Sequence, residues 1–214
     1  MPKPRYQNGT LLDQMANSYT VSSNPTNQLQ SIVESSGSSL TGGLVNGTMA
    51  YTYDGNGNML TNTNTVNTGQ NKSFTYNLLN LPQVATTAAS TVTYTYDAGG
   101  SKLRKSSLSG STTITTDYIS GIEYDSSTTA LTFIQTEEGR AIANGSTYNY
   151  EYYIGDNLGN TRVTFDTGTG SAHQVQQDDY YPFGLEILRG TTVSPKNEYL
   201  YNKKELQEEL QQYD

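Results

Sequence analysis

The sequence contains no cysteine and no tryptophan, and it has a single histidine. Without cysteine there can be no disulfide framework, no thiolate zinc site and no cysteine nucleophile. No run of residues approaches the roughly 20 apolar residues that a membrane-spanning helix needs, and residues 1–20 lack the apolar stretch of a signal peptide. The composition therefore argues against disulfide-stapled and helical membrane proteins.

Basic and large aliphatic residues are also scarce. Lys and Arg number 12 against 20 Asp and Glu, for a formal net charge of -8, and this acidic balance argues against a nucleic-acid partner. Leu, Ile, Val and Phe make up only about 18% of the chain, a level typical of disordered proteins. The 18 tyrosines and 31 threonines oppose disorder, because aromatic and β-branched residues favour strands.

A tyrosine-rich motif recurs along the middle of the chain. Residues 51–58 (YTYDGNGN) reappear as residues 94–101 (YTYDAGGS), and residues 74–77 (FTYN) form a degenerate copy between them. The copies are about 20 residues apart, and such a period predicts a repeat architecture.

Each copy has the pattern of a strand that enters a tight turn. Residues 91–96 alternate tyrosine or valine with threonine, which predicts a strand with two distinct faces. The residues that follow favour a hairpin turn, because Asp bonds nearby amides and Gly and Asn tolerate positive φ. The repeat residues to which we assign this structural role are Tyr53, Asp54, Gly57, Asn58, Tyr96 and Asp97.

The same pattern extends in both directions with looser spacing. Further strands are predicted at residues 10–15, 27–33, 102–105, 111–118, 130–135, 148–154, 161–165 and 197–201. Residues 22–27 and the Ser/Gly-rich residues 35–47 are expected to be loops, the latter a flexible connection. Residues 203–212 contain good helix formers with leucines four residues apart, which predicts a short C-terminal helix. We divide the chain into a degenerate N-terminal repeat region (1–47), the hairpin repeats (48–147) and a distinct final segment (148–214).

The final segment carries three specific strings: residues 153–163 (YIGDNLGNTRV), 177–184 (QDDYYPFG) and 201–207 (YNKKELQ). With the Tyr-Asp units, these strings resemble the YD repeats and repeat-associated core of bacterial Rhs proteins. The resemblance implies an all-β solenoid of stacked hairpins, of the kind that forms a hollow shell around a C-terminal toxin or other effector. Related YD-repeat proteins include the cocoon-forming components of insecticidal toxin complexes and the teneurin adhesion proteins. The motif residues that carry the resemblance are Asp156, Gly159, Asn160, Arg162, Tyr181, Pro182 and Gly184.

The chain departs from that family at its end. Family members continue past the YNKKE string, in many cases to an Asp-Pro self-cleavage site, whereas this sequence stops at Tyr213 and Asp214 and contains no Asp-Pro pair. We therefore expect a C-terminally truncated piece of a longer bacterial protein. Its expected partners are neighbouring repeats and a C-terminal effector of the parent chain, and its expected location is secreted or cell-surface, with an export signal outside this sequence.

Metal binding is considered at residues 54–58 (DGNGN), which match the oxygen-rich start of a calcium loop. The sixth position of such a loop should be Gly and is Met59, and the twelfth should be Glu and is Thr65. A hairpin turn explains these residues better, and we predict no metal and no cofactor.

Catalysis is considered for the carboxylates and the histidine. Asp178 and Asp179 are adjacent on an expected strand and should point to opposite faces, so they cannot flank one bond. Another carboxylate, such as Glu151 or Asp166, would be needed to complete a site, and nothing in the sequence selects either. His173 is expected to be an exposed loop residue, and no nucleophile elbow or nucleotide cradle occurs. We therefore expect a protein without enzymatic activity.

The tyrosine-rich strands leave two roles open. Cross-strand packing explains rings at alternate positions, and this favours a structural scaffold whose open sheet edges associate with other chains. The alternative is an adhesion or carbohydrate-binding module that uses exposed tyrosines, since each ring has an apolar face and a polar tip.

Overall fold

The computed structural model describes residues 3–7, 9–21, 24–36, 46–181, 184–189 and 196–214. The chain divides into two compact units. The first comprises Met1–Gly100 and Ser107–Thr113, and the second comprises Ser101–Ser106 and Ile114–Asp214.

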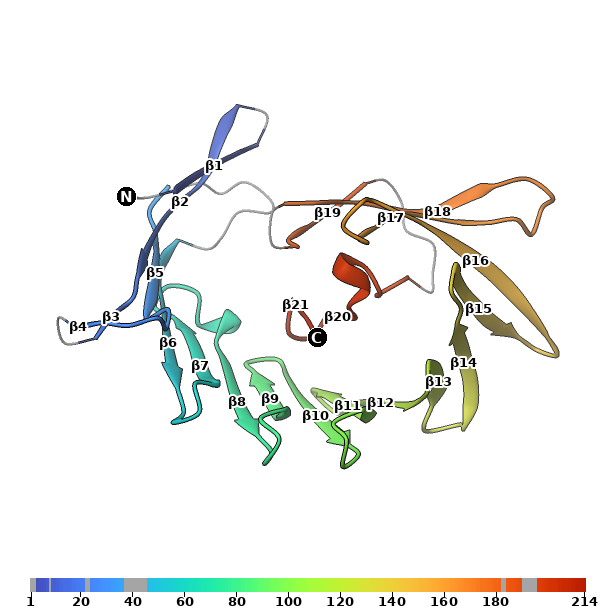
Figure 1. Ribbon diagram of the computed structural model, residues 1–214, viewed down its shortest axis with the longest axis horizontal. Helices are drawn as coiled ribbons and strands as arrows, with labels where there is room; N and C mark the ends of the chain where they lie inside the picture. The colour runs from blue at the N-terminus through green and yellow to red at the C-terminus, as the bar shows by residue number, and fades with distance from the viewer. Residues whose placement is uncertain (1–2, 8, 22–23, 37–45, 182–183, 190–195) are drawn as a thin grey trace. The chain divides into compact units, whose positions relative to one another are not determined.

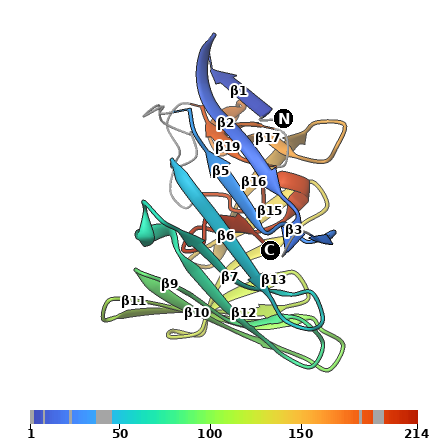
Figure 2. The same ribbon diagram turned by 90° about the vertical axis from the view of Figure 1, so that its left-hand side faces the viewer.

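The first unit is a run of antiparallel strands that pair in chain order. β1 pairs with β2, β2 pairs with β5, and each strand from β5 to β9 then pairs with the next one. The short strands β3 and β4 pair with each other. Figure 2 shows β5, β6 and β7 side by side in that order. The elements are β1 (Lys3–Gln7), β2 (Thr10–Ser18), β3 (Thr20–Val21), β4 (Asn24–Pro25), β5 (Ser31–Glu34), β6 (Gly47–Tyr53), β7 (Met59–Asn64), the 3-10 turn η1 (Thr68–Gln70), β8 (Lys72–Tyr76), β9 (Pro82–Thr87) and β10 (Ser90–Tyr96).

The second unit repeats this design. Strands β12 to β19 pair antiparallel in succession, and β20 pairs with β21. Figure 1 shows the hairpins following one another along the chain. The elements are β13 (Ile122–Asp125), β14 (Ala130–Gln135), β15 (Gly139–Asn144), β16 (Thr147–Gly155), β17 (Thr161–Asp166), β18 (His173–Tyr180), β19 (Glu186–Leu188), the 3-10 turn η2 (Tyr201–Lys203), β20 (Leu206–Gln207) and β21 (Gln212–Tyr213), while β11 (Lys102–Ser109) and β12 (Thr112–Ile119) contain residues of both units.

The fold is all-β, as the alternating tyrosine and threonine pattern predicts. Within the described part of the chain, no helix is long and apolar enough to cross a membrane. The predicted strand at 130–135 coincides with β14, and those at 91–96, 148–154 and 161–165 lie within β10, β16 and β17.

Burial of apolar side chains is spread thinly along the sheet. In the first unit, Phe74, Ala85 and Val92 lie opposite one another on three neighbouring strands and are buried. In the second unit the largest fully buried apolar side chains are Leu200 and Leu210. Each hairpin thus buries its face against its neighbours, which is how repeat proteins gain stability without one central core.

The predicted C-terminal helix is wrong. Residues 203–212 form the end of η2, then β20, a turn and part of β21, and Lys203 and Gln211 have positive φ. Glu205, Gln207 and Leu210 are all buried, a spacing that no single helix face can provide. A segment of about ten residues is marginal as a helix, and here its long-range contacts override its helix propensity.

Three further local predictions are also corrected. Residues 197–201 form no strand, only an isolated bridge between Tyr199 and Glu205. His173 does not lie in a loop, because it begins β18. The expected loop at 22–27 contains β4 and also residues 22–23 outside the described part, and most of the expected flexible connection at 35–47 lies outside that part as well.

Candidate functional site

The Tyr-Asp repeats end in one type of turn, seen first between β6 and β7. The Asp54 amide donates to the Asn58 carbonyl (2.9 Å), and the Gly57 amide donates to the Asp54 carbonyl (3.1 Å). The Asp54 carboxylate accepts the amides of Asn56 (2.9 Å) and Asn58 (2.8 Å) and the side-chain NH2 of Asn58 (2.9 Å). Gly57 has a φ of 89°, so a residue that tolerates positive φ is needed there.

The turn between β16 and β17 has the same bonds. The Asp156 carboxylate accepts the amides of Leu158 (2.9 Å) and Asn160 (3.1 Å) and the side-chain NH2 of Asn160 (2.9 Å), and Gly159 has a φ of 84°. The hydrogen bond from the Asn160 side chain, together with those from the amides, lowers the pKa of Asp156. Related turns begin at Asn77, where the side-chain oxygen accepts two amides, and at Asp97, where Gly100 takes the positive φ.

Tyrosine hydroxyls link successive hairpins. Tyr76 donates to the carbonyl of Met59, the residue after the first turn (2.7 Å). Tyr180 donates to the carbonyl of Thr161, the residue after the Asp156 turn (2.5 Å). Tyr53 makes a similar bond to the carbonyl of Leu29 (2.7 Å). We call these three bonds the tyrosine staples.

The motif Tyr181-Pro182-Phe183-Gly184 is only partly visible, since Pro182 and Phe183 lie outside the described residues. The Tyr181 amide donates to the Leu185 carbonyl (2.9 Å) and the Gly184 amide to the Tyr181 carbonyl (3.0 Å), the same backbone pattern as in the Asp turns. Gly184 has a φ of 90°, and a Cβ there would lie 2.8 Å from the Tyr201 ring. Glycine is therefore required at this position for both backbone and packing reasons.

Arg162 lies among carboxylates and a ring. Its guanidinium pairs with Asp179, lies 3.9 Å from the Asp156 carboxylate, and approaches the Tyr180 ring to 5.8 Å from the ring centre. These contacts fasten the Asp156 turn to β18.

The three strings that carry the Rhs resemblance come together in the second unit. The Asn202 amide donates to the Asn160 side chain (2.9 Å), and the Thr161 amide donates to the Leu200 carbonyl (3.0 Å). The rings of Tyr180 and Tyr201 are 5.7 Å apart. Residues distant in sequence thus form one packed cluster, although the sequence pattern alone did not place them together.

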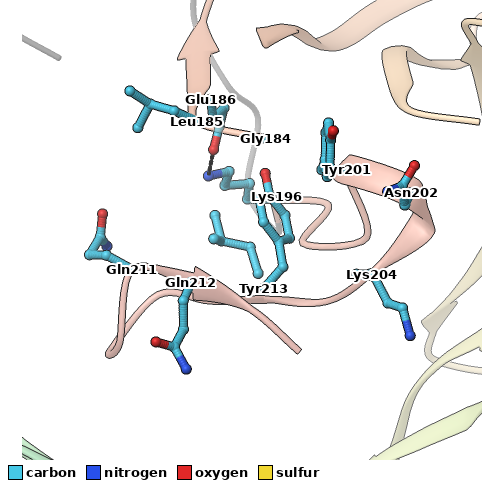
Figure 3. Close-up of a pocket in the computed structure, with 11 residues that line it drawn as sticks. Gly184, Leu185, Glu186, Lys196, Tyr201, Asn202, Lys204, Gln211, Gln212 and Tyr213 are labelled. Carbon is cyan, nitrogen blue, oxygen red and sulfur yellow. Dashed lines mark hydrogen bonds and ion pairs between the residues drawn. The ribbon is translucent and has the colours of Figure 1, made fainter. Parts of the chain in front are cut away.

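A cleft of about 780 Å³ opens beside this cluster (Figure 3). Tyr201 of η2 and Tyr213 of β21 line it, with ring centres 5.8 Å apart. The ion pair between Glu186 and Lys196 (3.4 Å) forms another part of its wall. Burial raises the pKa of the nearby Asp178 to about 7, and Glu186 adds to this rise.

A second buried polar cluster fixes the segment that was predicted to be a helix. The Glu205 carboxylate accepts Lys102 (2.8 Å), Lys105 (2.7 Å) and the Tyr118 hydroxyl (2.9 Å). Burial alone would raise the pKa of Glu205, but the two lysines lower it. Lys102 also pairs with Asp214.

Two further carboxyl groups crowd Glu205. Burial raises the pKa of Glu123 to about 7, although a hydrogen bond from Tyr199 (2.5 Å) opposes the rise. Burial likewise raises the pKa of Glu198 to about 7. Sequence reasoning missed this cluster, because Glu205 and its two lysines are about a hundred residues apart and nothing local links them.

Among the carboxylates considered for catalysis, Glu151 of β16 and Asp166 of β17 lie opposite each other, whereas Asp178 and Asp179 lie on β18. Asp178 is fully buried, while Asp179 pairs with Arg162 and Arg189. Glu151 pairs with Arg140 on the neighbouring strand (2.7 Å) and Asp166 with His173 (3.1 Å). Asp179, Glu151 and Asp166 thus each pair with a basic side chain, and one oxygen of Asp178 accepts the side-chain NH2 of Gln176 (3.0 Å).

The tyrosine rings on these strands differ in burial. Tyr94 is buried, and Tyr51, Tyr53 and Tyr199 are half-buried. Tyr148 and Tyr150 are 41% and 53% exposed. Packing therefore accounts for most of the rings, and β16 differs from the rest.

No family model matches this sequence, and no curated protein matches it significantly. Solved structures do share its fold. A crystal structure of TcdB2-TccC3-TEV matches 96% of this chain at 16% identity with a TM-score of 0.56. The Photorhabdus luminescens Tc holotoxin pore, with a mutation in TccC3, matches 92% at 13% identity with a TM-score of 0.50. The chain covers 11% and 14% of those two chains, so it has the fold of a small part of a toxin-complex component.

Proposed function

We propose that this chain is a non-enzymatic structural segment of a larger Rhs-type YD-repeat protein, forming part of a wall around or beside a C-terminal effector. The observation that carries the proposal is the recurrence of one device in both units: an Asx-type turn followed by a tyrosine staple to the residue after that turn. Such repetition builds an extendable sheet and creates no unique reactive centre.

The pairing of Glu205 and Glu151 favours a structural role for these two carboxylates. Glu205 is neutralised by two lysines, and Glu151 by Arg140. A general acid or base needs a perturbed group within reach of substrate, whereas these carboxylates hold strands and the C-terminal segment in place.

The proposed partners are neighbouring repeats and the effector of the same parent protein, secreted or displayed at the bacterial surface. Two lines of support agree: the Rhs-like motif strings and a fold shared with toxin-complex structures. Among the described residues β19, the last strand of the second run, pairs only with β18, and we propose that strands of the parent protein pair with its other edge.

The oligomeric behaviour of the isolated chain tests this proposal. An open sheet edge pairs with other chains, so light scattering coupled to gel filtration should give a weight-average mass that rises above 23.4 kDa with concentration. Ile187→Lys places a charge on β19 and should reduce the rise, whereas Val66→Lys, at an exposed position outside the strands, should not. A monodisperse monomer over a wide concentration range would count against a wall segment with open edges.

A further inference from the structure

Lys102 of β11 lies between two carboxylates of the C-terminal segment, and all three groups belong to the second unit. Its Nζ donates to Glu205 (2.8 Å) and is in direct contact with the side chain of Asp214, 112 residues away in the sequence. The same nitrogen lies 4.9 Å from the centre of the Tyr118 ring. An amine, a carboxyl carbon and a second carboxylate are thus held together, which are the groups needed to form an amide.

The backbone holds Asp214 in this position. Its amide donates to the Glu205 carbonyl (3.0 Å), and the preceding residue, Tyr213, pairs with Leu206 between β20 and β21. The side chains of Lys102 and Glu205 are only 12% and 5% exposed. Fixed contact greatly accelerates a reaction between two groups, and burial favours the neutral amine and acid over the charged pair.

The two carboxylates are suited to different roles. Glu205 accepts Lys102, Lys105 and the Tyr118 hydroxyl, and the two lysines lower its pKa, so it remains a carboxylate that can accept a proton. Within the described residues, Lys102 is the one group bonded to the Asp214 carboxylate. The Asp214 carbon is therefore the electrophile, and the 39% exposure of this side chain leaves a path for water to depart.

We propose that Lys102 and Asp214 become joined by a self-formed amide bond that fastens the C-terminal segment to β11. Lys102 gives one proton to the Asp214 carboxylate, and the resulting amine attacks the carboxyl carbon. Glu205 takes the second proton from that nitrogen and delivers it to the departing hydroxyl. The Nζ–Cγ bond forms, the Cγ–OH bond breaks and one water leaves, so no oxidant or cofactor is needed.

This modification goes beyond the role of a wall segment and does not depend on it. Each chain reacts once, so the reaction is not an enzymatic turnover. The chain has no cysteine and hence no disulfide. A covalent link between residues 112 apart would constrain the unfolded chain in the way that a disulfide does.

Lys196 provides a comparison within the same unit, because it also lies between two carboxylates. Its Nζ is 3.4 Å from Glu186 and 3.3 Å from Glu208. The side chains of Lys196 and Glu208 are 25% and 51% exposed. Water therefore solvates this pair more fully, and we expect no amide to form there.

Intact mass spectrometry of the purified, denatured whole chain tests the bond. The chain should be about 18 Da lighter than its sequence mass, the mass of one water. Because the linked lysine resists trypsin, digestion should yield residues 73–104 joined to residues 205–214. Fragmentation of this joined peptide should place the link between Lys102 and Asp214. This measurement uses the unchanged chain and needs no variant to fold.

Variants then separate the bond from the ion pair. Lys102→Arg keeps the positive charge but lacks the amine, so it should have its full sequence mass and a lower melting midpoint by circular dichroism. Asp214→Ala should also keep its full mass, and Glu205→Gln should leave most chains unjoined. The matched control, Lys196→Arg, should lose water as the unchanged chain does. The proposal is overturned if the unchanged chain has its full sequence mass, if Lys102→Arg still loses water, or if the link joins another pair.

Discussion

The side chains that define the repeat bond mainly to main-chain atoms. The carboxylates of Asp54 and Asp156 accept backbone amides inside their own turns, and the hydroxyls of Tyr76 and Tyr180 donate to carbonyls of the preceding hairpin. At this scale the motif is a set of local hydrogen bonds that fix turn shape and hairpin spacing.

Removing one tyrosine staple should weaken the second unit measurably. Tyr180→Phe deletes the donor to the Thr161 carbonyl and leaves that acceptor without the hydroxyl, at a cost of about 1–2 kcal/mol. Chemical denaturation measures the loss. Tyr148→Phe is the control, because its ring is exposed and its change should stay within about 0.5 kcal/mol. Equal stability of the two variants would mean that the staple contributes nothing.

At the scale of elements, the C-terminal segment is held by buried acids as well as by packing. Leu200 and Leu210 are buried in the same unit as Glu205 and its lysines. Burial raises the pKa of Glu123, and the charges of Glu205 and Glu198 add to that rise. Burying more acids than bases makes this attachment depend on pH.

The thermal midpoint should be higher near pH 5 than at pH 8. The folded-state pKa of Glu123 and of Glu198 is about 7, above the ordinary 4.5, so their stabilising contribution is full below the ordinary value and is lost as the pH rises through about 7. Glu205 acts oppositely: its pKa is lowered, so its contribution is lost as the pH falls through that lower value.

Scanning calorimetry from pH 4 to pH 8 measures this profile, and Glu123→Gln supplies the comparison. Removing one titrating group should flatten the fall between about pH 5 and pH 8. A midpoint that climbs steadily across that interval would contradict the expected direction.

Strands with strict alternation could be predicted from sequence, and elements set by distant contacts could not. Residues 91–96 alternate threonine with valine or tyrosine, and they lie within β10. Residues 139–144 (GRAIAN) have little β-branched or aromatic content, so β15 was not predicted; pairing with β16 along six residues supplies its stability. The helix prediction at 203–212 failed for the same reason, since Glu205 and Leu210 are fixed by contacts outside their own segment.

The candidate functional site likewise contains local features that the sequence predicts and distant contacts that it does not. The roles of Asp54 and Asp156 in turns follow from local side-chain chemistry and could be proposed from the sequence. The acceptors of Tyr76 and Tyr180 lie about 20 residues earlier, and the lysine partners of Glu205 about a hundred residues earlier. Such contacts depend on how hairpins stack, which local patterns do not encode.

At the scale of the whole molecule, stability should be distributed over neighbouring hairpins. Phe74→Ala removes a buried ring from the row on β8, β9 and β10, at a cost of about 3–5 kcal/mol to that region. Because repeats contact chiefly their neighbours, hydrogen exchange should accelerate in β7 to β10 and remain unchanged in β16 to β18. Uniform acceleration in both units would instead indicate one cooperative core.

The acceptor atoms of the tyrosine staples affect which substitutions the chain tolerates. Met59 and Thr161 contribute only their carbonyl oxygens to these bonds, and every amino acid carries that atom. Substitution at either position leaves the acceptor atom in place, although Thr161 is also buried and donates its hydroxyl to the Tyr199 carbonyl (3.0 Å). A bond to a main-chain acceptor therefore constrains the sequence at one of its two ends, the tyrosine, and leaves the identity of the other residue to its packing.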